Sequence, residues 1–286
     1  MARRVKTRRK QRASRKRSRL RRAYRGFVSA AKPAVRAVRG APLLVQFLAV
    51  TLAAVLVWLP LNWAYQVLRK PSELFFPVSG ALYKVPAETW RVYGPLFRRH
   101  STDVITAPFL AALAQVEGSG NPVVRTYWRW SLTHRPFEIY RPASSAVGMY
   151  QITDGTFAEA RRYCIRNHAV AEDGPWHAWR SCWFNALYTR TIPSHAVELT
   201  SAHLHRHSAR LVREHGLHGA TARQRRELAA AVHLCGPGGA AAYARRGLQA
   251  SGVNCGTHGL AAYLAKVSAF EAVFAGLAAA ERRGAR

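Results

Sequence analysis

The stretch from Thr106 to Pro122, TAPFLAALAQVEGSGNP, guides the interpretation of the second half of the chain. Thr106 can cap a helix, Pro108 suits its first turn, and apolar residues follow at helical spacing. Glu117 falls on the apolar face, four residues after Leu113, directly before the glycines and proline that stop a helix. Burial and the negative end of the helix dipole both disfavour an ionised carboxylate there. Because a general acid must keep its proton, Glu117 is the first candidate catalytic residue.

A second stretch, from Ser144 to Thr153, reads SSAVGMYQIT. A lone glutamate at the end of a helix is usually a partly exposed residue whose carboxylate is solvated. However, EGSGNP followed by this stretch resembles the paired motifs of the lytic transglycosylase (SLT-type) and goose-type lysozyme-like superfamily. In that family a Glu ends a helix ahead of Asn-Pro, and a later glycine-rich loop lines the glycan cleft. The resemblance implies Glu117 as the catalytic acid, with a set of substrate-binding residues that comprises Asn121, Ser145, Gly148, Met149, Tyr150 and Gln151.

Two later segments extend the resemblance in the family's order. HLCGPG, from His233, stands where the family usually has Tyr-Asn-small-Gly-x-Gly, and LAAYLAKV, from Leu260, resembles the late helix whose Tyr faces the acid. The resemblance therefore implies Tyr263 as a second residue of the catalytic site and His233 as a further substrate-binding residue. The chain departs from the family pattern at three places, which indicate a divergent member: Gly118 for Ser, Ser145 for Gly and Leu234 for Asn.

The resemblance implies a reaction that uses one carboxylate and needs neither metal nor cofactor. Glu117 would protonate the oxygen between N-acetylmuramic acid (MurNAc) and N-acetylglucosamine (GlcNAc), then take the proton of the C6 hydroxyl as a 1,6-anhydro ring closes. A lysozyme-like muramidase is the alternative, and its second carboxylate would be Glu138, Asp154 or Glu159. A peptidoglycan-binding module with weak or lost catalysis is the third possibility.

A long apolar segment precedes this region. From Gly40 to Leu68 the sequence carries no charge, and a helix needs roughly 20 apolar residues to cross a bilayer. Aromatic residues lie near its far end, as at a membrane interface. The segment is longer than the apolar core of a signal peptide, so we interpret it as an uncleaved anchor rather than a cleaved leader or a buried helix.

The net charge of +30 is concentrated before this segment. Residues 1–40 hold 17 Lys or Arg and no acid, whereas the remaining chain holds 27 basic and 14 acidic residues. The positive-inside rule then predicts a cytoplasmic N-terminus, a single pass through the inner membrane and a periplasmic catalytic domain. Anionic lipid is a better partner for this tail than nucleic acid, although basic arms do bind phosphates. Glycan strands, and a secretion or cell-wall machinery, are the other partners expected.

These features predict a mostly α chain, with a lysozyme-like (SLT) domain behind a single N-terminal transmembrane helix. The expected segments are a basic tail (1–40), an anchor (41–68), a juxtamembrane stalk (69–103) and a catalytic domain (104–286). In the stalk, Trp90, Tyr93 and Phe97 share one helical face, which would lie on the membrane or on the domain core. The loop at 123–143 carries several aromatic residues: Tyr127, Trp128, Trp130, Phe137 and Tyr140. Trp128 and Trp130, like Tyr150, are equally suited to stacking on sugars and to packing in the core.

Helices are expected at about 155–164, 194–215, 221–236 and 257–282, with little sheet. The helix at 194–215 has an inward stripe of Val197, Ser201, Leu204, Ser208 and Leu211.

Four cysteines in a domain outside the cytoplasm indicate two disulfides. Pairing of neighbours gives Cys164 with Cys182 and Cys235 with Cys255, and the other two pairings stay open. His203 and His207 are one helical turn apart and could bind zinc. Without a Cys-x-x-Cys pair, the sequence favours a solvated helix face for this histidine run and no metal site.

Overall fold

The computed structural model describes residues 32–33, 35–178 and 181–284. Contacts divide the chain after Tyr65 into two units. The described residues are mostly helical, as predicted, with three two-stranded antiparallel sheets. Most of the predicted basic tail, residues 1–31, lies outside the described residues.

The first unit contains most of helix α2 (Leu43–Arg69), whose apolar side chains are largely exposed. A helix of 27 residues is about 40 Å long, enough to cross the roughly 30 Å hydrocarbon core of a bilayer. Helix α9 (Leu260–Gly284) is also long and apolar enough to span, but it buries one face in the core of the second unit. The candidate membrane anchor is therefore α2.

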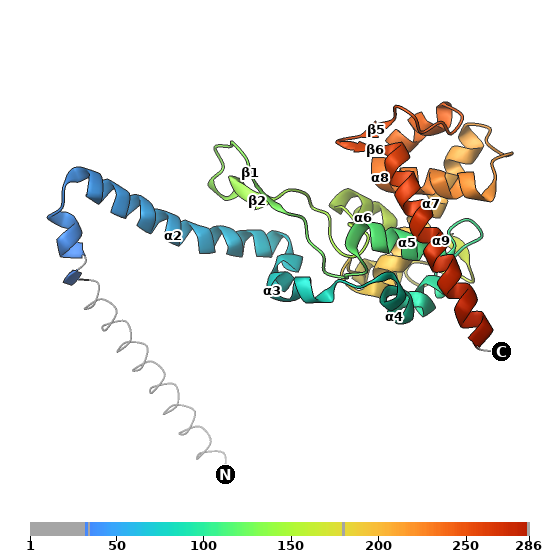
Figure 1. Cartoon of the computed structure of the whole chain (residues 1–286), viewed down its shortest axis with the longest axis horizontal. Coiled ribbons are helices and arrows are strands. Elements are labelled where there is room, and N and C mark those ends of the chain that lie inside the picture. Colours follow the sequence, from blue (N-terminus) through green and yellow to red (C-terminus); the bar gives the residue numbers. More distant parts are fainter. Residues whose placement is uncertain (1–31, 34, 179–180, 285–286) are drawn as a thin grey trace, which may run out of the picture. The chain divides into compact units, whose positions relative to one another are not determined.

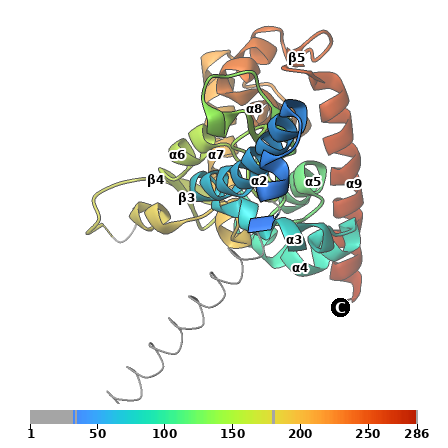
Figure 2. The same cartoon turned by 90° about the vertical axis from the view of Figure 1, so that its left-hand side faces the viewer.

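The second unit is built around helix α5 (Ala107–Gly118), which contains Glu117. Thr106 caps it as predicted, because its hydroxyl accepts a hydrogen bond from the amide of Phe109. All residues from Phe109 to Gln115 are buried, so α5 is covered on every side. Its most extensive neighbours are α9 and α4 (Pro86–Arg99), and α9 runs beside α5 in both views (Figure 1, Figure 2).

Helix α4 belongs to this core. Trp90, Tyr93 and Phe97 are buried in the same apolar cluster as α5, and Trp90 contacts Phe274 of α9 at a ring-centroid distance of 6.1 Å. Their shared face therefore covers the domain core. The segment 69–103, interpreted from sequence as a stalk, contributes a packed helix to the second unit.

Helices α7 (Pro193–Glu214) and α8 (Ala222–Arg245) pack against each other and complete the helical part of the unit. The inward stripe predicted for α7 is confirmed, since all five of its residues are buried. Thr221 and Gln224 form a capping box at the start of α8. The predicted end of this helix at Gly236 marks a kink, where φ is 69°, and helical structure continues to Arg245.

The expected helix at 155–164 is too long. Helix α6 (Asp154–Ala160) ends early, and Cys164 lies in strand β3 (Tyr163–Arg166), which pairs with β4 (Ala169–Glu172). The remaining short elements are α3 (Phe76–Ser79), β1 (Trp128–Trp130), β2 (Tyr140–Pro142), β5 (Asn254–Cys255), β6 (His258–Gly259), and the 3₁₀ turns η1 (Pro71–Phe75), η2 (Gly80–Leu82), η3 (Pro136–Glu138) and η4 (Trp183–Leu187).

Two disulfides join neighbouring cysteines in the sequence. Cys164 pairs with Cys182 and Cys235 with Cys255, which is the pairing of neighbours considered from sequence. The first ties β3 to the start of η4, and the second ties the α8 kink to β5. Each closes a loop of about 20 residues, which a chain-entropy estimate values at roughly 3 kcal/mol. Such bonds are typical of domains outside the cytoplasm.

Candidate active site

Glu117 occupies the last turn of α5, and its side chain is 19% exposed. The helix ends in a left-handed (αL) cap: Ser119 has a φ of 47°, its amide donates to the carbonyl of Gln115, and the amide of Gly120 donates to that of Ala114. The cap fixes where the helix ends and therefore where the carboxylate emerges. Glu117 is thus a mostly covered carboxylate on a rigid element that still reaches the surface.

Two side chains approach the same carboxylate oxygen. The hydroxyl of Tyr263, on α9, donates a hydrogen bond to Oε1 of Glu117 at 2.6 Å. Nε2 of His233, on α8, lies 3.6 Å from that oxygen. Burial, together with the nearby charge of Glu117 and the hydrogen bond itself, raises the pKa of Tyr263 well above its usual value. Tyr263 therefore keeps its proton and remains a donor.

The loop at 144–153 packs beneath the end of α5. Met149 and Tyr150 are fully buried, and the Tyr150 hydroxyl donates to the carbonyl of Leu110. Their side chains therefore belong to the core and present no surface to a ligand. Gly148 has a φ of 80°, and a Cβ there would overlap the carbonyl oxygen of Arg190, so the turn requires glycine.

The other predicted binding residues are either buried in the unit or partly exposed. Asn121 is fully buried; it donates to the Ser79 carbonyl at 2.7 Å and accepts from the Val123 amide at 2.9 Å, so its role here is to hold the loop. Ser145 and Gln151 are partly exposed, and Gln151 Nε2 donates to the carbonyls of two loop residues, Val124 and Gly148. Of the binding set, Ser145, Gln151 and His233 have side chains with some exposure.

The aromatic loop forms the β1–β2 hairpin. Trp128 donates its indole N–H to the buried carboxylate of Glu73, which gives it a structural role. Trp130 is 68% exposed and stacks on Tyr140 with ring centroids 4.6 Å apart. Tyr127 is also exposed. The outer part of this hairpin therefore presents aromatic faces of the kind that bind sugar rings.

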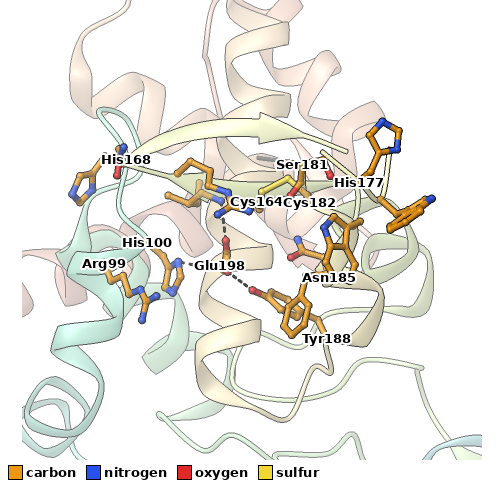
Figure 3. A pocket seen from close by; sticks show the side chains of 16 residues that line it. Arg99, His100, Cys164, His168, His177, Ser181, Cys182, Asn185, Tyr188 and Glu198 are labelled. Carbon is orange, nitrogen blue, oxygen red and sulfur yellow. Dashed lines mark hydrogen bonds and ion pairs between the residues drawn. A yellow bond between two sulfur atoms is a disulfide. The ribbon is translucent and has the colours of Figure 1, made fainter. Parts of the chain in front are cut away.

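A hollow of about 1010 Å³ lies elsewhere on the unit, and its lining includes Glu198 of α7 but not Glu117 (Figure 3). Glu198 accepts hydrogen bonds from the Ile165 amide at 2.9 Å and the Tyr188 hydroxyl at 2.7 Å. Nδ1 of His100 is 3.8 Å away. Burial lowers the pKa of His100, and the negative charge of Glu198 opposes that effect.

The sequence interpretation missed this carboxylate because Glu198 lies inside a helical run with no motif around it. Its two acceptor contacts link β3, the segment before α7 and α7 itself. In this arrangement Glu198 acts as a structural anchor, while exposed aromatic residues line the hollow: Trp176, Trp183 and Phe184.

Two of the three histidines in the run on α7 are buried, contrary to the expectation of a solvated face. His203 is 4% and His207 is 6% exposed, because α6 and α8 cover this part of α7. Nε2 of His207 lies 2.8 Å from Oε1 of Glu159 on α6. Burial, together with the charges of His207 and His233, lowers the pKa of His203 to about 3.

Comparison of the chain with models of protein families, with curated proteins and with solved structures finds no match.

Proposed function

We propose that this chain is a membrane-anchored peptidoglycan lytic transglycosylase with Glu117 as its acid and base. The observation that carries the proposal is the 2.6 Å hydrogen bond between Tyr263 and Glu117. The two residues were selected from separate motifs far apart in the sequence. Their meeting at one carboxylate supports the resemblance on which both assignments rest, and with it a lysozyme-like arrangement of the helices.

The chemistry follows from a single carboxyl group. Glu117 gives its proton to the oxygen of the β-1,4 bond between MurNAc and GlcNAc as the bond to C1 breaks. The substrate's N-acetyl group stabilises the cation that forms at C1. The carboxylate then removes the proton of the C6 hydroxyl, and O6 bonds to C1 to close the 1,6-anhydro ring. The proton count of the enzyme is restored, and no water is consumed.

Tyr263 and His233 have positioning roles in this scheme. The Tyr263 hydroxyl fixes the orientation of the carboxyl group through one oxygen, which leaves the other to face the sugar. It also stabilises the carboxylate that exists between the two proton transfers. Nε2 of His233, 3.6 Å from the same oxygen, would strengthen this effect when the imidazole is protonated.

A hydrolase would need a second carboxylate to activate water, and the candidate bases already have other partners. Glu138 lies within 3.6 Å of Arg69, Arg135 and Arg141, and its hydrogen bond to Arg135 is the main reason why its pKa is lowered. Asp154 is 2.8 Å from Arg190. Glu159 contacts His207. These contacts favour the lyase over the muramidase.

The proposed location is the inner membrane, with α2 as the single span, the N-terminus in the cytoplasm and the second unit in the periplasm. The exposed apolar surface of α2 and the two disulfides support this arrangement. In this location the enzyme would meet peptidoglycan strands directly, and the basic tail would meet anionic lipid head groups. A secretion or cell-wall machinery is the expected setting for local cutting.

The proposal is tested by incubating purified peptidoglycan with the full chain in detergent and identifying the products by mass spectrometry. The wild type and a Glu214→Gln control, which changes an exposed glutamate on α7, should release 1,6-anhydro-muropeptides. A Glu117→Gln variant should release none but still sediment with intact peptidoglycan. Products with ordinary reducing ends would indicate a muramidase. Binding without products from any variant would indicate a binding module.

A further inference from the structure

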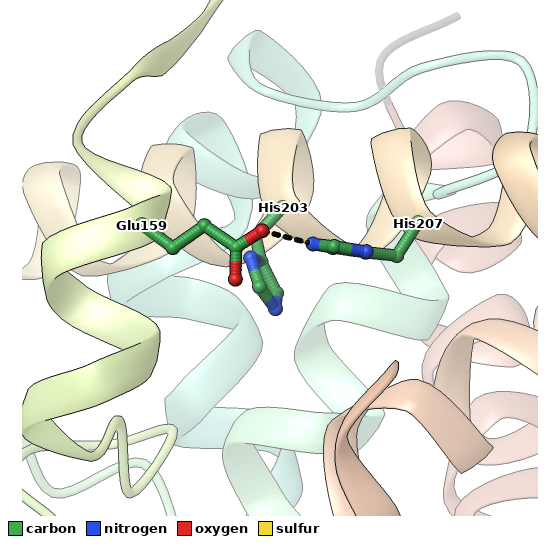
Figure 4. Close-up of side chains that lie close together, drawn as sticks. All are labelled: Glu159, His203 and His207. Carbon is green, nitrogen blue, oxygen red and sulfur yellow. Dashed lines mark hydrogen bonds and ion pairs between the residues drawn. The ribbon is translucent and has the colours of Figure 1, made fainter. Parts of the chain in front are cut away.

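Three side chains from two helices converge on one point of the second unit. Glu159 of α6, and His203 and His207 of α7, each offer a ligand atom within 4.8 Å of the others. The two histidines are four residues apart, so both project from the same face of α7. Figure 4 shows the His203 ring beside the Glu159 carboxylate, which the His207 ring also approaches.

The cluster holds a buried polar atom that lacks a partner. His203 is 4% exposed, and its Nδ1 has no hydrogen-bond partner among the described residues. Buried polar atoms are nearly always paired, so an unpaired one beside a carboxylate and a second imidazole requires an explanation. Glu159 and His207 contact each other, whereas Nδ1 of His203 finds no partner in the described part of the chain.

We propose that Glu159, His203 and His207 bind one divalent transition-metal ion, with Zn²⁺ as the best match to this donor set. Two imidazoles favour zinc and its first-row neighbours over Mg²⁺ and Ca²⁺, which prefer sites built wholly from oxygen. Three protein ligands leave a coordination position for water, as in zinc sites with two histidines and one glutamate.

The ion would join α6 to α7. Helix α6 begins at Asp154, directly after the loop that contains Gly148 and Gln151, and the backbone of Met149 in that loop lies against the end of α5. An ion that restrains α6 would therefore also restrain the loop that packs beneath the helix turn containing Glu117. The inference concerns metal binding and stability alone, so it does not depend on the proposed reaction.

The experiment uses the full chain, purified in detergent without a histidine tag and freed of metal with a chelator. The protein is dialysed against Zn²⁺ held at a fixed free concentration by a weak chelator. Metal per chain is then measured by elemental mass spectrometry. Thermal unfolding with and without Zn²⁺ gives a second readout, since an ion that binds the folded state raises the melting temperature. Co²⁺ replaces Zn²⁺ for a visible spectrum that reports coordination by nitrogen and oxygen.

The decisive variants are Glu159→Gln and His207→Gln, with His205→Gln as the matched control. His205 lies between the two ligands in sequence but contacts Thr102 and Asp103 instead. Glu159→Gln suits the test because its side chain is 39% exposed and the amide can still accept from His207, so the metal-free fold is retained.

The wild type and the His205→Gln control are expected to bind one Zn²⁺ per chain and to melt at higher temperature with it. Each ligand variant should lose more than about tenfold in zinc affinity, and with it the melting shift. The chain has 12 histidines, so weak binding elsewhere is expected. Equal uptake by the wild type and Glu159→Gln would overturn the proposal. So would the absence of a melting shift in the wild type, or loss of zinc from the His205→Gln control.

Discussion

The hydroxyl of Tyr263 lies 2.6 Å from Oε1 of Glu117, although the two residues are 146 positions apart in the chain. The contact joins the last turn of α5 to the first turn of α9, and these helices form the most extensively packed pair among the described elements. Because both helices are anchored in the core, neither side chain needs a moving loop to reach the other. The carboxyl group is therefore oriented before any substrate arrives.

A Tyr263→Phe substitution removes this donor and leaves the ring. A hydrogen bond to a charged group is worth about 1.5–3 kcal/mol, so the turnover rate on peptidoglycan should fall about 10- to 100-fold. The Michaelis constant should change little, because Tyr263 contacts the acid rather than the glycan. Tyr83→Phe is the control, since Tyr83 is exposed and is not part of the aromatic hairpin. Equal turnover rates for the wild type and Tyr263→Phe would show that the Tyr263 hydroxyl does not contribute to catalysis.

Gly118 stands where the resembled family usually has Ser, and the structure gives a steric reason. A Cβ at this position would lie 2.9 Å from Cγ1 of Val124 and 3.0 Å from Cα of Met149. A Gly118→Ser substitution should therefore lower the free energy of unfolding by about 1–3 kcal/mol.

Gly155 provides the matched comparison for this substitution, because a Cβ there would meet nothing within 4 Å. Gly155→Ser should change stability by less than about 0.5 kcal/mol. Urea denaturation of the full chain in detergent measures both variants. If Gly118→Ser were as stable as Gly155→Ser, the loop under α5 would have shifted at little energetic cost to accommodate the added side chain.

Stability should depend on pH through His100, whose pKa lies below the usual 6.5 because the ring is buried. The positive charge of Arg99 adds to this effect, and the negative charge of Glu198 opposes it. Below pH of about 6.5 the unfolded chain binds a proton that folded His100 does not. The free energy of unfolding therefore falls as pH falls, by up to about 1.4 kcal/mol per pH unit for one group.

A His100→Asn variant removes this difference in proton binding. Its free energy of unfolding should fall less steeply than that of the wild type between pH of about 6.5 and 5, while other buried histidines keep a residual slope. Chemical denaturation across this range measures both slopes. Equal slopes for the wild type and His100→Asn would mean that the pKa of His100 is the same in the folded and unfolded states.

Membrane topology gives a prediction that does not involve catalysis. In the proposed topology the basic tail is cytoplasmic and α2 is the single span, so a reporter fused after the last residue should lie in the periplasm. A reporter that is active only after export should therefore be active, and one that matures only in the cytoplasm should be silent. The opposite pattern would place the second unit on the cytoplasmic side, where its disulfides are not expected to persist.

The sequence predicted those features that depend on local patterns. Helix α5 carries its own start and stop signals, from Thr106 to the glycines after Glu117, and both ends fall where expected. The inward stripe of α7 follows from a repeat of small and apolar residues on one helical face. The glutamate–tyrosine contact followed from a resemblance between motifs rather than from any local rule.

The features that sequence could not reveal depend on contacts between distant segments. Cys164 was assigned to a helix, but its strand pairs with Ala171 and neighbouring residues beyond a turn. His203 and His207 lie outside the inward stripe of α7, yet neighbouring elements cover them. Tyr150 looked equally suited to binding or packing, and only the path of its loop under α5 decides for packing.

The source of oxygen in the products distinguishes transglycosylation by Glu117 from hydrolysis. Peptidoglycan is digested by the full chain in water enriched in ¹⁸O, and the released muropeptides are weighed by mass spectrometry. Intramolecular attack by the C6 hydroxyl consumes no water, so the released anhydro-muropeptides should contain no ¹⁸O. Reducing-end products that carry one ¹⁸O at C1 of MurNAc would rule out the transglycosylase, because a water molecule would then have been the nucleophile.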